Sequence, residues 1–79
     1  LPYIEKIEEA LTHMGEAIHK NIRKVDVCTR YSAMQYLIIL SQPTEPEIPN
    51  IMTRIFMQYY KLQDSQNFTP TYEYITMKD

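Results

Sequence analysis

The chain has 79 residues, of which 44% are hydrophobic and 23% are charged, with a single glycine. This composition is typical of a globular domain with a packed core and excludes a disordered segment, although so short a chain gains little stability from burial. Eight lysines and arginines against ten aspartates and glutamates leave a formal charge of −2, which argues against a nucleic-acid partner or a generally basic membrane-binding surface.

Cysteine content and hydropathy bear on the expected location. The one cysteine, Cys28, cannot form an intramolecular disulfide, which fits a reducing cytoplasm. No apolar run is long enough to cross a bilayer, and the start Leu1-Pro2-Tyr3 has no signal-peptide pattern. We therefore expect a cytoplasmic protein without direct membrane insertion, either free or as the cytoplasmic part of a membrane-anchored sensor.

The first predicted element is an amphipathic helix from residue 3 to about residue 21. Pro2 suits its first turn, and acidic residues near its start and basic residues near its end complement the helix dipole. Apolar residues recur every three or four positions and should face a sheet: Ile4, Ile7, Leu11, Met14 and Ile18.

Two strand patterns and a turn come next. Apolar and polar residues alternate from Val25 to Tyr31, which predicts a strand with one buried face. The continuous apolar run from Tyr36 to Leu40 predicts a central strand buried on both faces. The residues between the two runs predict a β-hairpin with a longer loop.

The remaining segments predict a linker, a helix, a loop and a third strand. Two prolines between residues 41 and 47 end the second strand, and Pro49 fits the first turn of a helix whose apolar stripe runs to Leu62 and faces the same sheet. Residues 63–67 predict a polar loop, and the alternation over residues 69–77 predicts a strand. The expected fold class is α+β, in the order α-β-β-α-β with a central antiparallel hairpin.

Residues around the hairpin resemble the GGDEF domain of bacterial diguanylate cyclases. In that family an Arg-Tyr pair, here Arg30-Tyr31, precedes Gly-Gly-Asp/Glu-Glu-Phe, and an aliphatic strand and a helix carrying Ala-Glu-Arg-Ile-Arg follow. The helix here reads Met-Thr-Arg54-Ile-Phe. The resemblance covers nearly the whole chain. It implies a partial nucleotide-cyclase palm-like fold, with residues 1–79 forming part of one domain that lacks the family's first strand and last helix.

The signature itself is replaced by Ser32, Ala33, Met34, Gln35 and Tyr36. A cyclase needs a carboxylate at the third position for Mg²⁺ and glycines at the first two to admit GTP. A thioether, a neutral amide and two additional Cβ atoms supply neither. We therefore expect no cyclase activity, no metal site and no cofactor, and the ring of Tyr36 is a candidate to fill the former nucleotide pocket.

The resemblance implies a ligand site outside the signature. The family's inhibitory-site motif, Arg-x-x-Asp, is present as Arg23 and Asp26, and Arg54 matches the helix arginine that joins it. In family members the arginines grip the phosphate and guanine of cyclic di-GMP and the aspartate accepts from a guanine edge. The residues leave a structural interpretation open, since an arginine at a helix end can cap carbonyls and an aspartate can order a turn.

Other reactive residue types are interpreted as structural. His13 and His19 are six positions apart and do not share a helix face, as paired metal ligands would. Cys28 is expected to be a small core residue, and Arg30 to be solvated or paired with a carboxylate. Core and sheet packing should explain most of the tyrosines at positions 31, 36, 59, 60, 72 and 74.

Together these observations predict a catalytically inactive GGDEF-like signalling module of a larger bacterial protein. Cyclic di-GMP would bind through Arg23, Asp26 and Arg54, and the partners would be other domains of the parent protein and a second copy in a homodimer. The alternative is a purely structural dimerisation or protein-interaction module of a bacterial sensor. An active cyclase with unusual residues would need metal ligands that the turn does not supply.

Overall fold

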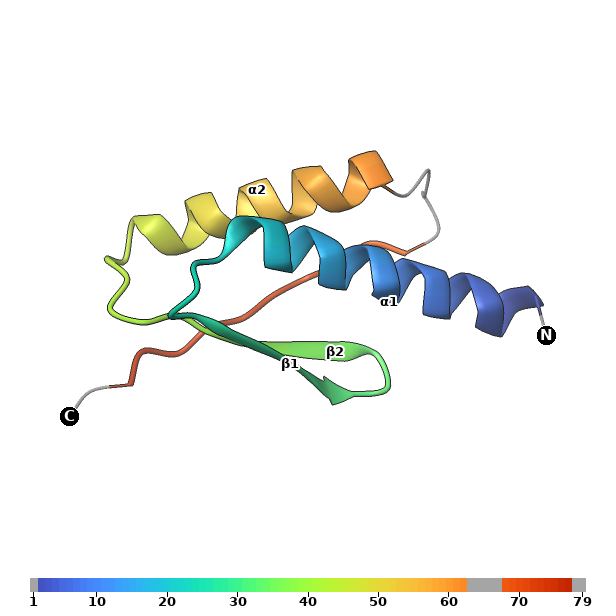
Figure 1. Cartoon of the computed structure of the whole chain (residues 1–79), viewed down its shortest axis with the longest axis horizontal. Helices are drawn as coiled ribbons and strands as arrows, with labels where there is room; N and C mark the ends of the chain where they lie inside the picture. Colours follow the sequence, from blue (N-terminus) through green and yellow to red (C-terminus); the bar gives the residue numbers. More distant parts are fainter. Residues whose placement is uncertain (1, 63–67, 78–79) are drawn as a thin grey trace.

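The computed structural model describes residues 2–62 and 68–77, and it is an α+β fold as predicted. Its elements are α1 (Pro2–Asn21), β1 (Val27–Ser32), β2 (Gln35–Ile39) and α2 (Glu47–Leu62). The two helices lie side by side, and the β1–β2 hairpin lies on one side of the pair (Figure 1). The predicted loop over residues 63–67 lies outside the described residues.

Both predicted helices form, because their apolar residues repeat at helical spacing and have a surface to cover. The apolar stripe of α1 is buried in its later turns, where Leu11 and Ile18 lie in the core, whereas Ile4 is 54% exposed. The prediction that Ile4 faces the sheet is therefore wrong. The hairpin reaches only the later turns of α1, so the first turn has less to pack against (Figure 1).

The hairpin is antiparallel and tighter than predicted. Cys28 pairs with Ile38 and Arg30 with Tyr36, and an irregularity follows before Ser32 pairs with Gln35. Because Ser32 and Gln35 are already paired, the connection is a two-residue turn formed by Ala33 and Met34. The prediction of a longer loop is therefore wrong, and most of residues 32–36, which replace the signature, belong to strands.

Only one face of the hairpin is covered. Ile38 is half-buried on the helix side, whereas Leu37 and Ile39 on the other face are each 42% exposed. The prediction of a central strand buried on both faces is wrong. A continuous apolar run does not specify how many layers cover a strand; here both helices pack on the same side.

The predicted third strand is absent from residues 68–77, so the order among the described residues is α-β-β-α. This segment instead packs against α2. The hydroxyl of Tyr59 donates to the carbonyl of Phe68 at 3.0 Å, and the rings of Phe56 and Tyr72 lie 5.9 Å apart. Alternation of apolar and polar residues determines which face each side chain takes. A strand also needs the edge of a neighbouring strand to hydrogen-bond its backbone. Among the described residues no backbone hydrogen bond joins this segment to the hairpin.

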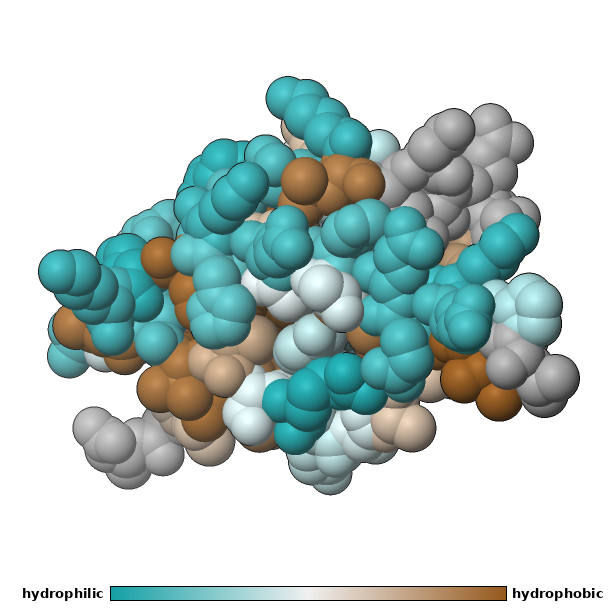
Figure 2. Space-filling model, turned by 45° about the vertical axis from the view of Figure 1, so that its right-hand side comes forward, coloured by the Kyte–Doolittle hydropathy of each residue, from teal (hydrophilic) through white to brown (hydrophobic). Residues whose placement is uncertain are grey.

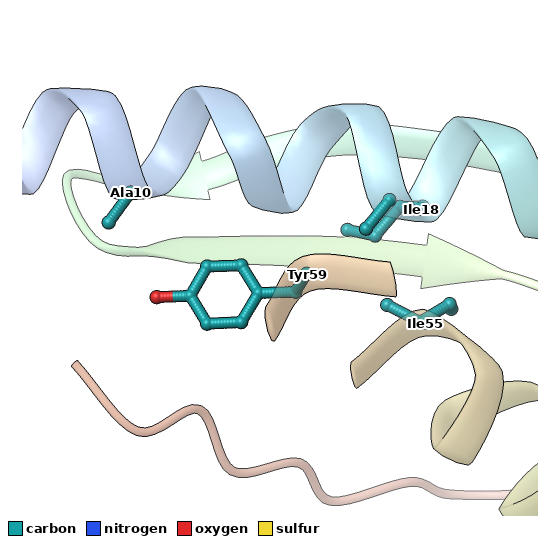
Figure 3. Packing of buried hydrophobic residues seen from close by; sticks show 5 residues of the cluster. Ala10, Ile18, Ile55 and Tyr59 are labelled. Carbon is teal, nitrogen blue, oxygen red and sulfur yellow. The ribbon is translucent and has the colours of Figure 1, made fainter. Parts of the chain in front are cut away.

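The core is a small cluster between α1, α2 and the inner face of the hairpin. Small residues on α1 let the helices approach closely, and larger ones from both helices fill the space (Figure 3). The buried members of the cluster are Ala10, Ala17, Ile18, Ile55 and Tyr59.

Much apolar surface remains outside this core. Hydrophobic patches interrupt the hydrophilic surface in Figure 2. Tyr31 is 70% exposed, and Tyr60, Tyr72 and Tyr74 are also exposed. Core packing therefore accounts for Tyr59 and partly for Tyr36, and the expectation that it explains most of the tyrosines is wrong.

Candidate binding site at the base of the hairpin

A solvent-open depression of about 200 Å³ lies where the end of α1, the α1–β1 connection and the first half of α2 meet. All three residues named from the inhibitory-site motif line it, although they are separated by up to 31 positions in the sequence. Its lining residues are Asn21, Arg23, Asp26, Glu47, Asn50, Ile51 and Arg54.

Asp26 forms the inner wall of the depression and is fully engaged within the protein. Its side chain is 2% exposed. Oδ1 accepts from the Ser41 N–H at 2.9 Å and from Nη2 of Arg23 at 3.1 Å. Oδ2 accepts from the N–H of Arg23 at 2.7 Å and from its Nε at 3.2 Å. These four bonds fill the acceptor capacity of a carboxylate.

The pKa of Asp26 reflects this environment. Burial by itself raises the pKa, but the hydrogen bonds from Ser41 and Arg23 and the positive charge of Arg23 outweigh it and lower the pKa below the usual 3.8. Asp26 is therefore ionised at neutral pH. It ties the α1–β1 connection to the segment that follows β2, which is the turn-ordering role that the sequence left open.

Arg23 takes part in this hydrogen-bond network and is also exposed to solvent. Its guanidinium holds Asp26 and also donates from Nη2 to the carbonyl of Ser41. Its side chain is nevertheless 57% exposed, and Nη1 makes no hydrogen bond within residues 2–62 and 68–77. Part of a positively charged fork thus remains available to solvent.

Arg54 reaches the depression from α2. Glu47, Asn50, Ile51 and Arg54 are spaced by three and four residues, so they share one face of the helix. Arg54 is exposed and forms no ion pair with any residue that the structure describes. It contributes an uncommitted positive charge opposite Arg23.

Glu47 is the opposing charge at the rim. Its Oε1 accepts from the hydroxyl of Thr44 at 2.7 Å and from the Thr44 N–H at 3.2 Å. These two bonds, assisted by the charge of Arg23, lower the pKa of Glu47 below its usual 4.5. The carboxylate is therefore ionised at neutral pH and reduces the net positive charge of the depression.

The sequence interpretation did not name Glu47 and Asn50. Helical spacing back from Arg54 is the signal that finds them, because positions three, four and seven residues earlier lie on the same face. The Thr44-x-x-Glu47 pattern is likewise a capping signature visible in the sequence.

The signature residues lie at the other end of the hairpin and take no part in the depression. The Ser32 hydroxyl donates to Oε1 of Gln35 at 2.7 Å, and Met34 is 61% exposed at the tip. Arg30 donates to the carbonyls of Ser32 and Ala33 at 3.2 and 2.7 Å. Arg30 is exposed, as expected of a solvated residue, and it also braces the turn through these two bonds.

Tyr36 points inward from β2 against α1. Its hydroxyl donates to the carbonyl of Leu11 at 2.7 Å, and the guanidinium carbon of Arg30, its cross-strand partner, lies over the ring at 5.5 Å from the centroid. A Cβ placed on Gly15 would lie 2.7 Å from the same hydroxyl. The ring therefore occupies the space between hairpin and helix.

The cysteine and the two histidines do not line the depression. Cys28 is half-buried, and burial raises the pKa of its thiol above the usual 9.0, so the thiol is protonated at neutral pH. His13 and His19 lie on α1, the former half-buried and the latter exposed. Within the described ranges no group of three or more histidine, cysteine or acidic residues is arranged to hold a metal ion.

Comparisons with protein-family models, with curated proteins and with solved structures find no match to this chain. No helix in the described part of the chain has both the length and the apolar character needed to span a bilayer. The geometry of the depression is accordingly the main basis for a functional proposal.

Proposed function

We propose that the chain is a catalytically inactive, GGDEF-like signalling module that binds cyclic di-GMP in the depression at the base of the hairpin. The observation that carries the proposal is the meeting of Arg23, Asp26 and Arg54 at one depression. These are the three positions that match the family's inhibitory site. The exposed parts of two guanidinium groups provide charge and directional donors for a phosphodiester.

Calorimetric titration of cyclic di-GMP into the 79-residue chain tests this proposal directly. Saturable binding at micromolar ligand is expected, and Arg54→Gln should weaken it about tenfold or more, since a charge-assisted hydrogen bond is lost. Lys6→Gln is the matched control, because it removes the same charge from an exposed position on α1 outside the depression. Absence of saturable binding, or equal losses in both variants, would refute the proposal.

The proposal includes the absence of diguanylate cyclase activity. The turn offers Met34 and Gln35 where Mg²⁺ would need carboxylates, and Ser32 and Gln35 are held in a tight pair. No cyclic di-GMP should form from GTP with Mg²⁺ or Mn²⁺, and Met34→Asp alone should not restore it. Metal-dependent product that disappears on chelation would contradict this.

A structural dimerisation module is the second candidate, and the outer face of the hairpin favours it. Val27, Leu37 and Ile39 are 51%, 42% and 42% exposed there. No charged residue lies among the positions that the strand pairing places on this face, which are Val27, Thr29, Ser32, Gln35, Leu37 and Ile39. Sedimentation over a concentration series tests it: a dimer that Leu37→Lys dissociates supports this role, and a monomer throughout rejects it.

A further inference from the structure

We infer that the depression recognises the phosphate groups of its ligand and does not select the nucleobase. This inference rests on the proposed function, since it concerns the same site, and it departs from the recognition that the GGDEF resemblance implies. Asp26 positions Arg23, and the two arginines contact the ligand.

The engagement of Asp26 is the first step of the argument. Discrimination of guanine requires an acceptor for the N–H groups on the base edge. All four acceptor positions of Asp26 are occupied by Arg23 and Ser41, and the side chain is 2% exposed. Accepting from a base would require breaking bonds that hold both connecting segments together, which a buried carboxylate does only at considerable cost.

The remaining groups favour an anion. Nη1 of Arg23 and the guanidinium of Arg54 form no hydrogen bond or ion pair with a described residue, and the side-chain amide of Asn50, in the first turn of α2, lies beside them. Donors of this type, near the positive end of a helix dipole, suit phosphate oxygens. The depression is open to solvent and its volume of about 200 Å³ lies below the usual range for a ligand pocket, so it can enclose only part of a dinucleotide.

Glu47 argues the other way, and it makes the inference testable. It is charged, its Oε1 is bound to Thr44, and Oε2 forms no hydrogen bond with a described residue. If the site recognises phosphate, this carboxylate weakens binding by repulsion. If the site recognises guanine, the same oxygen is the charged acceptor open to the base, beside the neutral amide oxygens of Asn21 and Asn50.

The experiment titrates the whole chain at constant ionic strength with cyclic di-GMP, cyclic di-AMP and inorganic pyrophosphate, followed by the side-chain Nε–H resonances of the arginines. We expect the two dinucleotides to bind with dissociation constants within about threefold of each other. Pyrophosphate should shift the same Arg23 and Arg54 signals and displace either dinucleotide. Binding of all three should weaken as salt is raised.

Three variants separate the possible contacts. Glu47→Gln keeps an acceptor for Thr44 and removes the charge, so binding of all three ligands should tighten by about threefold. Asp26→Asn should weaken all three equally, because it loosens Arg23. The Asn50→Asp variant is the matched reciprocal change, since it adds a negative charge on the same helix face and should weaken all three.

The outcomes distinguish this inference from the proposed function. Tenfold or greater preference for cyclic di-GMP, or loss of that preference in Glu47→Gln, would overturn phosphate recognition while leaving the receptor role intact. Binding of pyrophosphate without either dinucleotide would support the phosphate site and refute the receptor role. Absence of any shift at Arg23 and Arg54 with all three ligands would refute both.

Discussion

Gly15 and Tyr36 show how a single contact between elements determines which residue is tolerated. Glycine in the middle of a helix is ordinarily about 0.5–1 kcal/mol less stable than alanine. Here a Cβ at position 15 would lie 2.7 Å from the Tyr36 hydroxyl, closer than such atoms can approach. The glycine is thus explained by the hydroxyl that reaches the Leu11 carbonyl, and not by the backbone of α1.

Gly15→Ala should therefore destabilise the protein, by roughly 1–3 kcal/mol if the ring is forced aside as in an overpacked core. In a Tyr36→Phe background the hydroxyl is gone and the nearest ring carbon is 3.4 Å away, so the same change should be neutral or stabilising. Urea unfolding of the four proteins in this double-mutant cycle measures the difference. Equal effects of Gly15→Ala in both backgrounds would show that the hydroxyl is not responsible.

Asp26 predicts a specific loss of stability in acid. Its pKa in the folded state is lowered below 3.8, so the ionised form stabilises the fold fully above the unfolded-state value. That contribution should disappear as pH falls through the folded pKa. Asp26→Asn should be less stable near neutrality and should lack this component of the pH dependence.

Urea unfolding of both proteins between about pH 7 and pH 2, together with the carboxyl carbon shift of Asp26, measures this effect. The carboxyl resonance of the folded protein should titrate below 3.8. A midpoint at or above that value, or parallel stability curves for the two proteins, would contradict the network described here.

At the scale of elements, helix boundaries were predictable because their signals are local. The periodicity of α1 and α2 depends on residues three and four positions apart, and both helices form close to their expected limits. Strand pairing depends on a distant edge, and for this reason the alternation over residues 69–77 did not suffice to predict a strand. The same limitation applies to β2, whose apolar run did not reveal that one face is uncovered.

The start of α2 provides a test at this scale. Thr44 donates from its hydroxyl and its N–H to Glu47, and the Glu47 N–H returns a bond to the Thr44 carbonyl at 3.0 Å. Thr44→Ala should destabilise the protein by roughly 0.5–2 kcal/mol, in the range of other lost helix caps. Thermal unfolding measures this, with Thr53→Ala, an exposed position inside α2, as the control. A smaller effect at Thr44 than at Thr53 would exclude a capping role.

At the scale of the whole molecule, one small cluster holds both helices and the hairpin. Ile55 is fully buried at its centre, between α1 and α2 (Figure 3). Ile55→Ala should cost roughly 2–5 kcal/mol, a large part of the stability of a small domain. Met57→Ala on the same helix is the control, because Met57 is 57% exposed. Equivalent losses in chemical denaturation would show that the stability does not depend on this cluster.

Three of the residues that line the depression were named from motif register, but the contacts of each within the fold were not predictable. Arg23, Asp26 and Arg54 were named from positions in the sequence, and they do line one depression. That Asp26 is buried and saturated depends on the Ser41 N–H, which lies 15 positions later and across the hairpin. No local pattern contains that information.

The sequence by itself determined the two helices, the antiparallel hairpin between them and the absence of carboxylates from the hairpin turn, because each depends on residue identity and short-range spacing. Only the tertiary structure decided that β2 is covered on one face, that residues 68–77 pack against α2, and that Asp26 holds Arg23. Each of these depends on which surfaces meet. The free energy of such contacts arises between residues far apart in the chain, and chain order alone does not specify them.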